Sequence, residues 1–177
     1  MPQLLLIIVL FLQASLVNAQ KNKHIQFTSY TTAGILAGES PVAFSVQTVN
    51  GVSYNKWFLG AGFGLDDYYM KTLPLFASVR KNFELKKCRV FLYADAGTHF
   101  LVNPDNHEEG LYSYNTNGKW YLEGGAGLKV GSGKKGFILT VGNQYKNIAK
   151  VEEYPDSYRN ETVYKLGSIS VRAGVQL

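Results

Sequence analysis

The sequence predicts an all-β protein folded as an eight-stranded antiparallel up-and-down β-barrel. Two observations carry this prediction. Apolar residues alternate with polar residues or glycine in eight stretches of about ten residues, which is typical of strands with one apolar face. Short and long connections between these stretches mostly alternate along the chain, as expected when successive strands of a barrel reverse at opposite ends.

The expected strands follow one another without a linker or a low-complexity segment. Alternation is clearest in the last of them, where Ile169, Val171 and Val175 are separated by polar residues and glycine. In the third strand the apolar residues alternate with Gly60, Gly62 and Gly64, and the first two strands alternate more weakly. The eight strands are expected at Ser29–Ala37, Val42–Val52, Trp57–Leu65, Leu73–Asn82, Val90–Phe100, Trp120–Val130, Phe137–Lys146 and Ser168–Leu177.

The connections divide into two sets, one for each end of the barrel. The tight turns at one end are Ser53–Lys56, Glu84–Lys87 and Gly131–Lys135. The connections at the other end are the short Gly38–Pro41 and the longer Asp66–Thr72, Val102–Lys119 and Asn147–Thr162. This asymmetry is typical of transmembrane barrels of bacterial outer membranes, which have short periplasmic turns and longer external loops.

Composition excludes several classes of protein. Of 177 residues, 46% are hydrophobic and 18% are charged, the reverse of a disordered chain. A single cysteine excludes a disulfide framework and a multi-cysteine zinc site. The net charge of +5 is not gathered into a basic block, so no nucleic-acid partner is expected. No run of about 18 apolar residues follows the N-terminus, which argues against a helical membrane protein.

The first nineteen residues are typical of a secretory signal peptide. Leu4–Leu12 is an unbroken apolar run, and Val17-Asn18-Ala19 is a small-residue cleavage site. We therefore expect a signal peptide at 1–19 and a single barrel domain at 20–177.

The apolar face of the expected strands could meet either lipid or a protein core. A soluble periplasmic or secreted barrel of the lipocalin kind would turn it inward, around a small hydrophobic ligand. Lipid is favoured because the opposite face carries few charges and because strands of about ten residues match a tilted bilayer crossing. Aromatic residues also gather at both strand ends, as in interfacial girdles, namely Tyr54, Trp57, Phe83, Tyr68, Tyr69, Phe100, Tyr112, Trp120 and Tyr145.

Charged residues on the polar face would lie in the lumen of the barrel. An eight-stranded barrel is only wide enough to be filled by its own side chains, so buried charges must pair or hold water. We expect them to form a salt-bridged plug, and a gated narrow pore is the alternative. The residues are Arg80, Asp95, Glu123, Lys129, Lys146 and Arg172.

Several segments resemble small outer-membrane β-barrel proteins of the Bacteroidota, of the OmpA/OmpX type. They are FSVQTVNG (44–51), Asn55-Lys56-Trp57, GAGFGLD (60–66), LPLFASVR (73–80) and YADAG (93–97). The resemblance covers nearly the whole chain after the signal peptide. It implies an eight-stranded barrel in the cell outer membrane, and it implies no particular catalytic activity.

No motif in the chain demands a cofactor, a metal or a catalytic mechanism. Gly131–Gly136 fits G-x-G-x-x-G by letter, but a strand rather than a helix follows it, so a hairpin turn is expected. A lipid-modifying enzyme would need a nucleophile beside a histidine base and a carboxylate. His99 and Asp95 share a face, but Thr98 points to the other one. We therefore expect no enzyme, with lipid modification as an alternative.

The sequence thus predicts an exported outer-membrane barrel with a structural or surface-interaction role. Its expected partners are outer-membrane lipid and an extracellular protein or glycan that contacts the long loops. Those loops carry acidic residues and one histidine, namely Asp105, His107, Glu108, Glu109, Glu152, Glu153 and Asp156.

Overall fold

The computed structural model describes residues 25–85, 88–102, 107–109, 112–131, 135–153 and 159–177. The expected signal peptide lies outside these residues. In the described part of the chain, no helix has the length and apolar character needed to cross a membrane. The strands are β1 (Ile25–Gly38), β2 (Ala43–Tyr54), β3 (Trp57–Asp66), β4 (Thr72–Glu84), β5 (Arg89–Leu101), β6 (His107–Glu109), β7 (Tyr112–Val130), β8 (Gly136–Glu153) and β9 (Arg159–Gln176).

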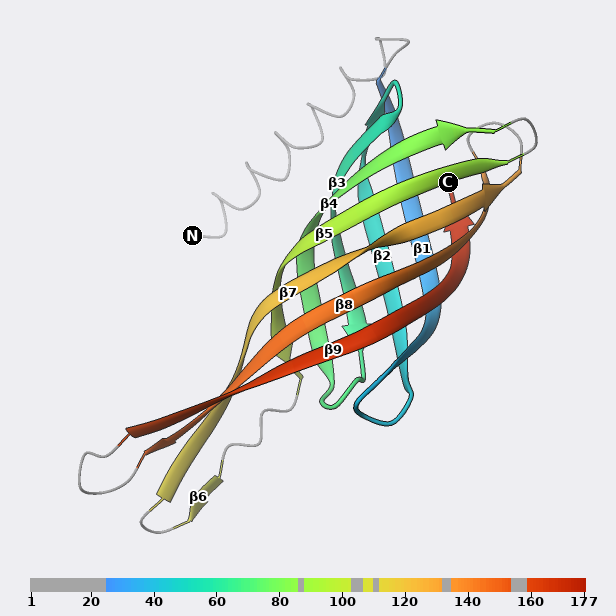
Figure 1. Cartoon of the computed structure of the whole chain (residues 1–177). Coiled ribbons are helices and arrows are strands. Elements are labelled where there is room, and N and C mark those ends of the chain that lie inside the picture. Colours follow the sequence, from blue (N-terminus) through green and yellow to red (C-terminus); the bar gives the residue numbers. More distant parts are fainter. Residues whose placement is uncertain (1–24, 86–87, 103–106, 110–111, 132–134, 154–158) are drawn as a thin grey trace, which may run out of the picture.

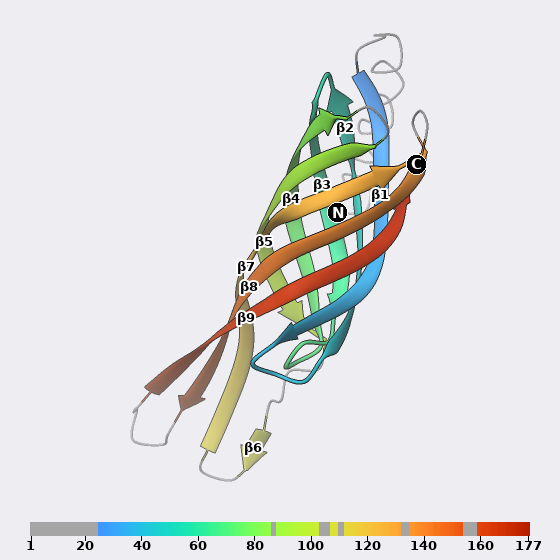
Figure 2. The same cartoon turned by 45° about the vertical axis from the view of Figure 1, so that its right-hand side comes forward.

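Eight of these strands close into an antiparallel up-and-down barrel, which confirms the predicted fold class (Figures 1 and 2). β1 pairs with both β2 and β9, and β5 pairs with β7, so the sheet returns on itself. The three-residue β6 lies outside the barrel and pairs only with the start of β7. At the β2–β3 turn Asn55 has a φ of 55°, a left-handed conformation that asparagine tolerates better than most residues.

The two faces of the barrel strands differ as the alternation predicts, with apolar side chains outward and polar ones inward. On β4, Leu75 and Val79 are 52% and 40% exposed, whereas Ser78 and Arg80, the two neighbours of Val79, are buried. We call the outward-facing side chains of the barrel strands the outer wall. A soluble lipocalin-like barrel would require the opposite orientation, with the apolar face inside.

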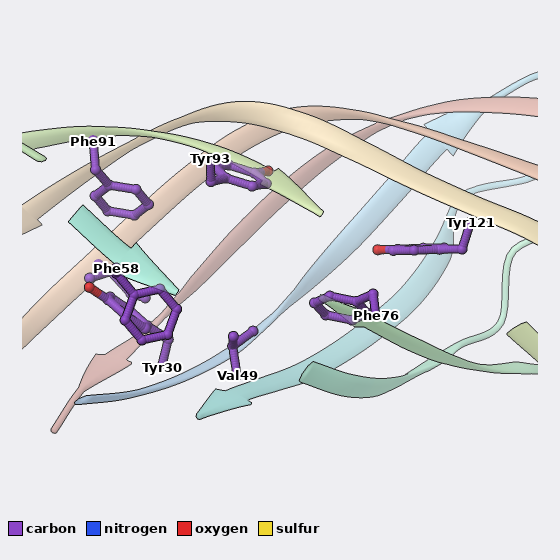
Figure 3. Close-up of a cluster of buried hydrophobic side chains, with 8 residues drawn as sticks. Tyr30, Val49, Phe58, Phe76, Phe91, Tyr93 and Tyr121 are labelled. Atoms are coloured by element: carbon purple, nitrogen blue, oxygen red, sulfur yellow. The ribbon is translucent and has the colours of Figure 1, made fainter. Parts of the chain in front are cut away.

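Large and small residues alternate inside the lumen, so that aromatic rings fill it near the short turns. A Cβ on Gly127 would lie 2.2 Å from the Phe91 ring, and one on Gly62 would lie 2.4 Å from the Phe76 ring. Glycine is therefore required opposite these rings. The buried cluster is drawn in Figure 3 and consists of Tyr30, Val49, Phe58, Phe76, Phe91, Tyr93, Tyr121 and Ile138.

The expected long loops are largely strand, which corrects the sequence-based boundaries. β7 begins at Tyr112 rather than Trp120, β8 runs on to Glu153, and β9 begins at Arg159. β1 stops pairing with β9 at Ser168, so these three strands continue past the barrel, as Figures 1 and 2 show. We call residues 112–118, 147–153 and 159–167, together with β6, the sheet extension.

The physical reason for this difference is the loss of strict alternation. Tyr, Thr, Val and Asn in the sheet extension favour or tolerate strands, but the successive residues Ile148 and Ala149 on β8 are both buried, so burial no longer follows period two there. A β-bulge marks the junction with the barrel, since Lys119 and Trp120 on β7 stand opposite Asn147 alone on β8.

Candidate functional site

The polar lumen gathers all six charged residues expected there. Arg80, Asp95, Glu123, Lys129, Lys146 and Arg172 are each at most 5% exposed. Each is carried on an inward position of β4, β5, β7, β8 or β9, because the strand parity places it there. Five of them fall into three groups at successive levels of the barrel, and Lys129 lies at the short-turn end of β7, opposite Arg89 on β5.

The first group centres on an ion pair between Glu123 and Arg172. The two side chains are 0% and 2% exposed and make two contacts, one of them between Arg172 Nη2 and Glu123 Oε2 at 3.0 Å. Arg172 also donates from Nε to Ser45 Oγ at 3.1 Å and from Nη2 to Gln144 Oε1 at 3.1 Å. This two-point, charge-assisted geometry is the strongest form of such a contact.

Neutral donors complete the coordination of the Glu123 carboxylate. The hydroxyls of Tyr121, Tyr93 and Ser170 donate to it at 2.6, 2.8 and 2.8 Å. Gln47 Nε2 donates to Tyr121 Oη at 2.7 Å. Because β2 and β7 lie on opposite sides of the barrel in the strand order, this chain of contacts spans the whole lumen. We call it the Glu123 network.

A second polar connection crosses the lumen nearer the sheet extension. Lys146 Nζ on β8 lies 3.3 Å from Asp66 Oδ2 on β3, and both side chains are 1% exposed. Gln144 Nε2 donates to the same oxygen at 2.5 Å, and Asp66 Oδ1 accepts from the Tyr68 backbone N–H at 2.7 Å. β3 and β8 are also opposite strands, so this ion pair crosses the lumen as well. We call it the Asp66–Lys146 strut.

Tyr68 covers the lumen at the end nearer the sheet extension, next to the Asp66–Lys146 pair. Its hydroxyl donates to the Gly167 carbonyl at 3.0 Å and accepts from the Ser40 N–H at 3.0 Å. Its ring is fully buried in a small cluster with Leu36, Ile148 and Leu166. The connection after β3 is therefore folded inward as a cap.

The third group lies toward the short turns, where Arg80 sits among aromatic rings. Its guanidinium carbon is 4.0 Å from the centroid of Tyr30 and 5.4 Å from that of Phe91. Cation–π contacts of this kind stabilise a cation that has left water. Arg80 Nε also donates to Ser78 Oγ at 3.5 Å, whereas Arg80 Nη1 and Asp95 Oδ1 have no hydrogen-bond partner among the described residues.

The remaining residues singled out from the sequence do not form a catalytic arrangement within the described chain. His99 is buried, and neither ring nitrogen has a hydrogen-bond partner among the described residues. The Thr98 hydroxyl donates instead to the Lys119 carbonyl at 2.7 Å. Asp105 and Asp156 lie outside the described residues. His107, Glu108 and Glu109 form β6, and Glu152 and Glu153 end β8.

Asp66, Tyr93 and Tyr121 were not expected among the residues that hold these groups together. Tyr68 was expected in an interfacial girdle, but it is fully buried and faces the inside of the barrel. Asp66 was assigned to a loop, although it follows Gly60, Gly62 and Gly64 at even spacing and so shares their inward parity. Continuing the period by one step would have placed it in the lumen. Tyr68 has no such signal, because it lies beyond the strand.

Comparisons with known proteins support the fold. No protein-family model matches the chain, and no curated protein matches it in sequence. Among solved structures, the crystal structure of Neisserial surface protein A (NspA) is similar over 88% of this chain and 99% of that chain, with a TM-score of 0.59 and 16% sequence identity. At this identity the similarity shows a shared barrel fold.

Proposed function

We propose that this chain is an outer-membrane β-barrel protein with a plugged lumen, whose sheet extension is a contact surface outside the cell. The observation that carries the proposal is the orientation of the two faces. Large apolar side chains cover the outer wall while polar and charged ones fill the inside. Such an apolar belt is far larger than the patches that soluble monomers expose, and lipid is the solvent that would cover it.

The ends of the outer wall support the same proposal. Near the short turns Tyr54, Trp57 and Phe83 are 54%, 51% and 40% exposed. Toward the sheet extension Phe100 and Trp120 are 56% and 66% exposed. Two aromatic bands separated by an aliphatic one match the girdles at the two interfaces of a membrane barrel.

The Glu123 network and the Asp66–Lys146 strut favour a plug over a pore. Both cross the full width of the lumen, and the Glu123 carboxylate is saturated with donors. A permeating ion would have to break contacts between buried charges, which costs several kcal/mol. We therefore assign the lumen a structural role.

The sheet extension is the part of the chain best suited to a partner. In the described register β9 pairs with β1 only from Ser168 onward, so residues 159–167 pair with β8 on one side alone. An exposed strand edge offers unpaired backbone groups to an extended segment of another protein. Glu161, Thr162, Val163, Tyr164 and Lys165 are all exposed there. This suits polar contacts with an extracellular protein or glycan.

The finer assignment, to OmpA/OmpX-type barrels of the Bacteroidota, belongs to the same proposal. Its support is the resemblance of the barrel segments given above and the structural similarity to a protein named as a Neisserial surface protein. Both agree with a place in the cell outer membrane.

The orientation can be tested with cysteines at the two ends of the barrel. Cys88 at the short-turn end is the single cysteine of the chain, so Thr162→Cys in a Cys88→Ser background moves the thiol to the sheet extension. In intact cells we expect a membrane-impermeant maleimide to label the Thr162→Cys variant and to leave native Cys88 unlabelled until the outer membrane is permeabilised. Labelling of Cys88 but not of the variant would reverse the orientation. Equal labelling of both would contradict membrane insertion.

A further inference from the structure

One charged residue on the outer wall has no ion pair within the described chain. It is Lys81 on β4, between Val79 and Phe83, whereas the exposed Lys119 at the other end of the barrel is paired with Glu161. Glu84, which is near Lys81, is paired with Arg89 at 3.2 Å. A charge on the lipid face costs free energy that grows toward the midplane, so this lysine requires a counter-charge or an escape toward water.

The Lys81 side chain is held at the level of the short-turn aromatic band. Its Nζ lies 5.0 Å from the Trp57 ring centroid and 5.7 Å from that of Phe83. Trp57 is the direct cross-strand partner of Lys81, so the register fixes the pair. The amine thus reaches the interface along an aromatic surface, as expected of a snorkelling lysine.

A second lysine lies in the adjacent β2–β3 turn, whose backbone is held against β4. The Asn82 backbone N–H and side-chain amide both donate to the Lys56 carbonyl, at 2.7 and 3.3 Å, and hold the β2–β3 turn against β4. Lys56 is exposed and precedes Trp57 in the chain. Two lysines therefore flank one tryptophan at the membrane rim, on a surface that carries no acidic residue at the described outward positions.

We propose that Lys81 and Lys56, with the rings of Trp57 and Phe83, bind the phosphate headgroup of an anionic phospholipid in the leaflet at the short-turn end. The proposal rests on membrane insertion as proposed above. The lipid phosphate supplies the counter-charge that the protein does not provide, and its acyl chains lie along the apolar outer wall. Juxtamembrane lysines attract anionic lipid by about fivefold each.

The two tryptophans of the chain allow a test with a built-in control, because Trp57 lies at the site and Trp120 at the other end. A Trp120→Phe variant is reconstituted in vesicles of phosphatidylcholine mixed with brominated phosphatidylglycerol, and quenching of Trp57 gives the preference for the anionic lipid. We expect about a 25-fold preference at low salt, from about fivefold for each of the two lysines. Lys81→Gln should reduce it to about fivefold and the double variant Lys56→Gln/Lys81→Gln to near one, whereas Lys119→Gln at the other end of the barrel should leave it unchanged.

The outcomes separate the lipid site from membrane insertion. Quenching of both tryptophans by brominated phosphatidylcholine alone is expected from insertion, and absence of quenching would overturn insertion and the lipid site together. Quenching without an anionic preference at Trp57, or a preference that is undiminished by the double variant Lys56→Gln/Lys81→Gln, would overturn the lipid site alone. A Trp57→Phe variant, reporting from Trp120, should show no such preference.

Discussion

Replacing Glu123 by alanine is expected to lower the free energy of unfolding by about 3–5 kcal/mol, because it leaves the buried Arg172 guanidinium without its counter-ion. Three hydroxyls from Tyr93, Tyr121 and Ser170 lose their acceptor in the same step. Urea unfolding in detergent micelles, followed by tryptophan fluorescence, would measure the change.

Asp95 offers a matched control for Glu123. It stands directly opposite Glu123 in the β5–β7 register and is also buried, but one of its oxygens has no hydrogen-bond partner among the described residues. Asp95→Asn removes a like charge beside Glu123 and also the negative charge that offsets Arg80, with which it forms no direct ion pair. Because these two effects oppose each other, the free energy of unfolding is expected to change by about 1 kcal/mol or less. Equal losses for the two variants would mean that the Glu123 network is not the principal strut of the lumen.

Introducing arginine at the centre of the outer wall is expected to have the second largest effect. Val141 is 51% exposed near the middle of the barrel part of β8, between Leu139 and Asn143. If this surface faces hydrocarbon, Val141→Arg should lower the free energy of unfolding in lipid bilayers by about 2–4 kcal/mol. Unfolding titrations in vesicles of defined lipid would measure it.

Phe137 is the control for that substitution, because it begins β8 beside the short turn and is 74% exposed. There arginine can reach the headgroups, so Phe137→Arg should cost only about 0–1 kcal/mol. A soluble barrel would make both substitutions nearly neutral, since both side chains would stand in water. The difference between the two variants therefore reports on depth in a membrane.

The barrel could be predicted from the sequence because each of its faces imposes period two on the chain. The strands of the barrel, their outward residues such as Leu59 and Val171, and the inward charges follow from parity alone. The sheet extension could not be predicted in this way. Between Asn147 and Val151 the buried side chains do not alternate, since Ile148, Ala149 and Val151 are all buried, so period two does not mark this part of the strand.

Which side chains lie in the lumen could be predicted from the sequence better than which of them contact one another. The parity of Arg172 and Glu123 places both inside, but their pairing depends on the strand order and the stagger of the closed barrel. Lys146 pairs with Asp66, which lies 80 residues earlier on the opposite strand and was expected in a loop. The alternation of residues along the chain contains no information on contacts between strands on opposite sides of the barrel.

Heat modifiability tests the central claim, a closed barrel that folds in a lipid-like environment, most directly. The mature chain is refolded in detergent and run on an SDS gel with and without boiling. Closed barrels with an apolar outer wall resist SDS until heated, so we expect two bands, the unboiled one displaced from the position of the boiled chain. A single band at one position, from protein that is folded and monomeric without detergent, would contradict the account.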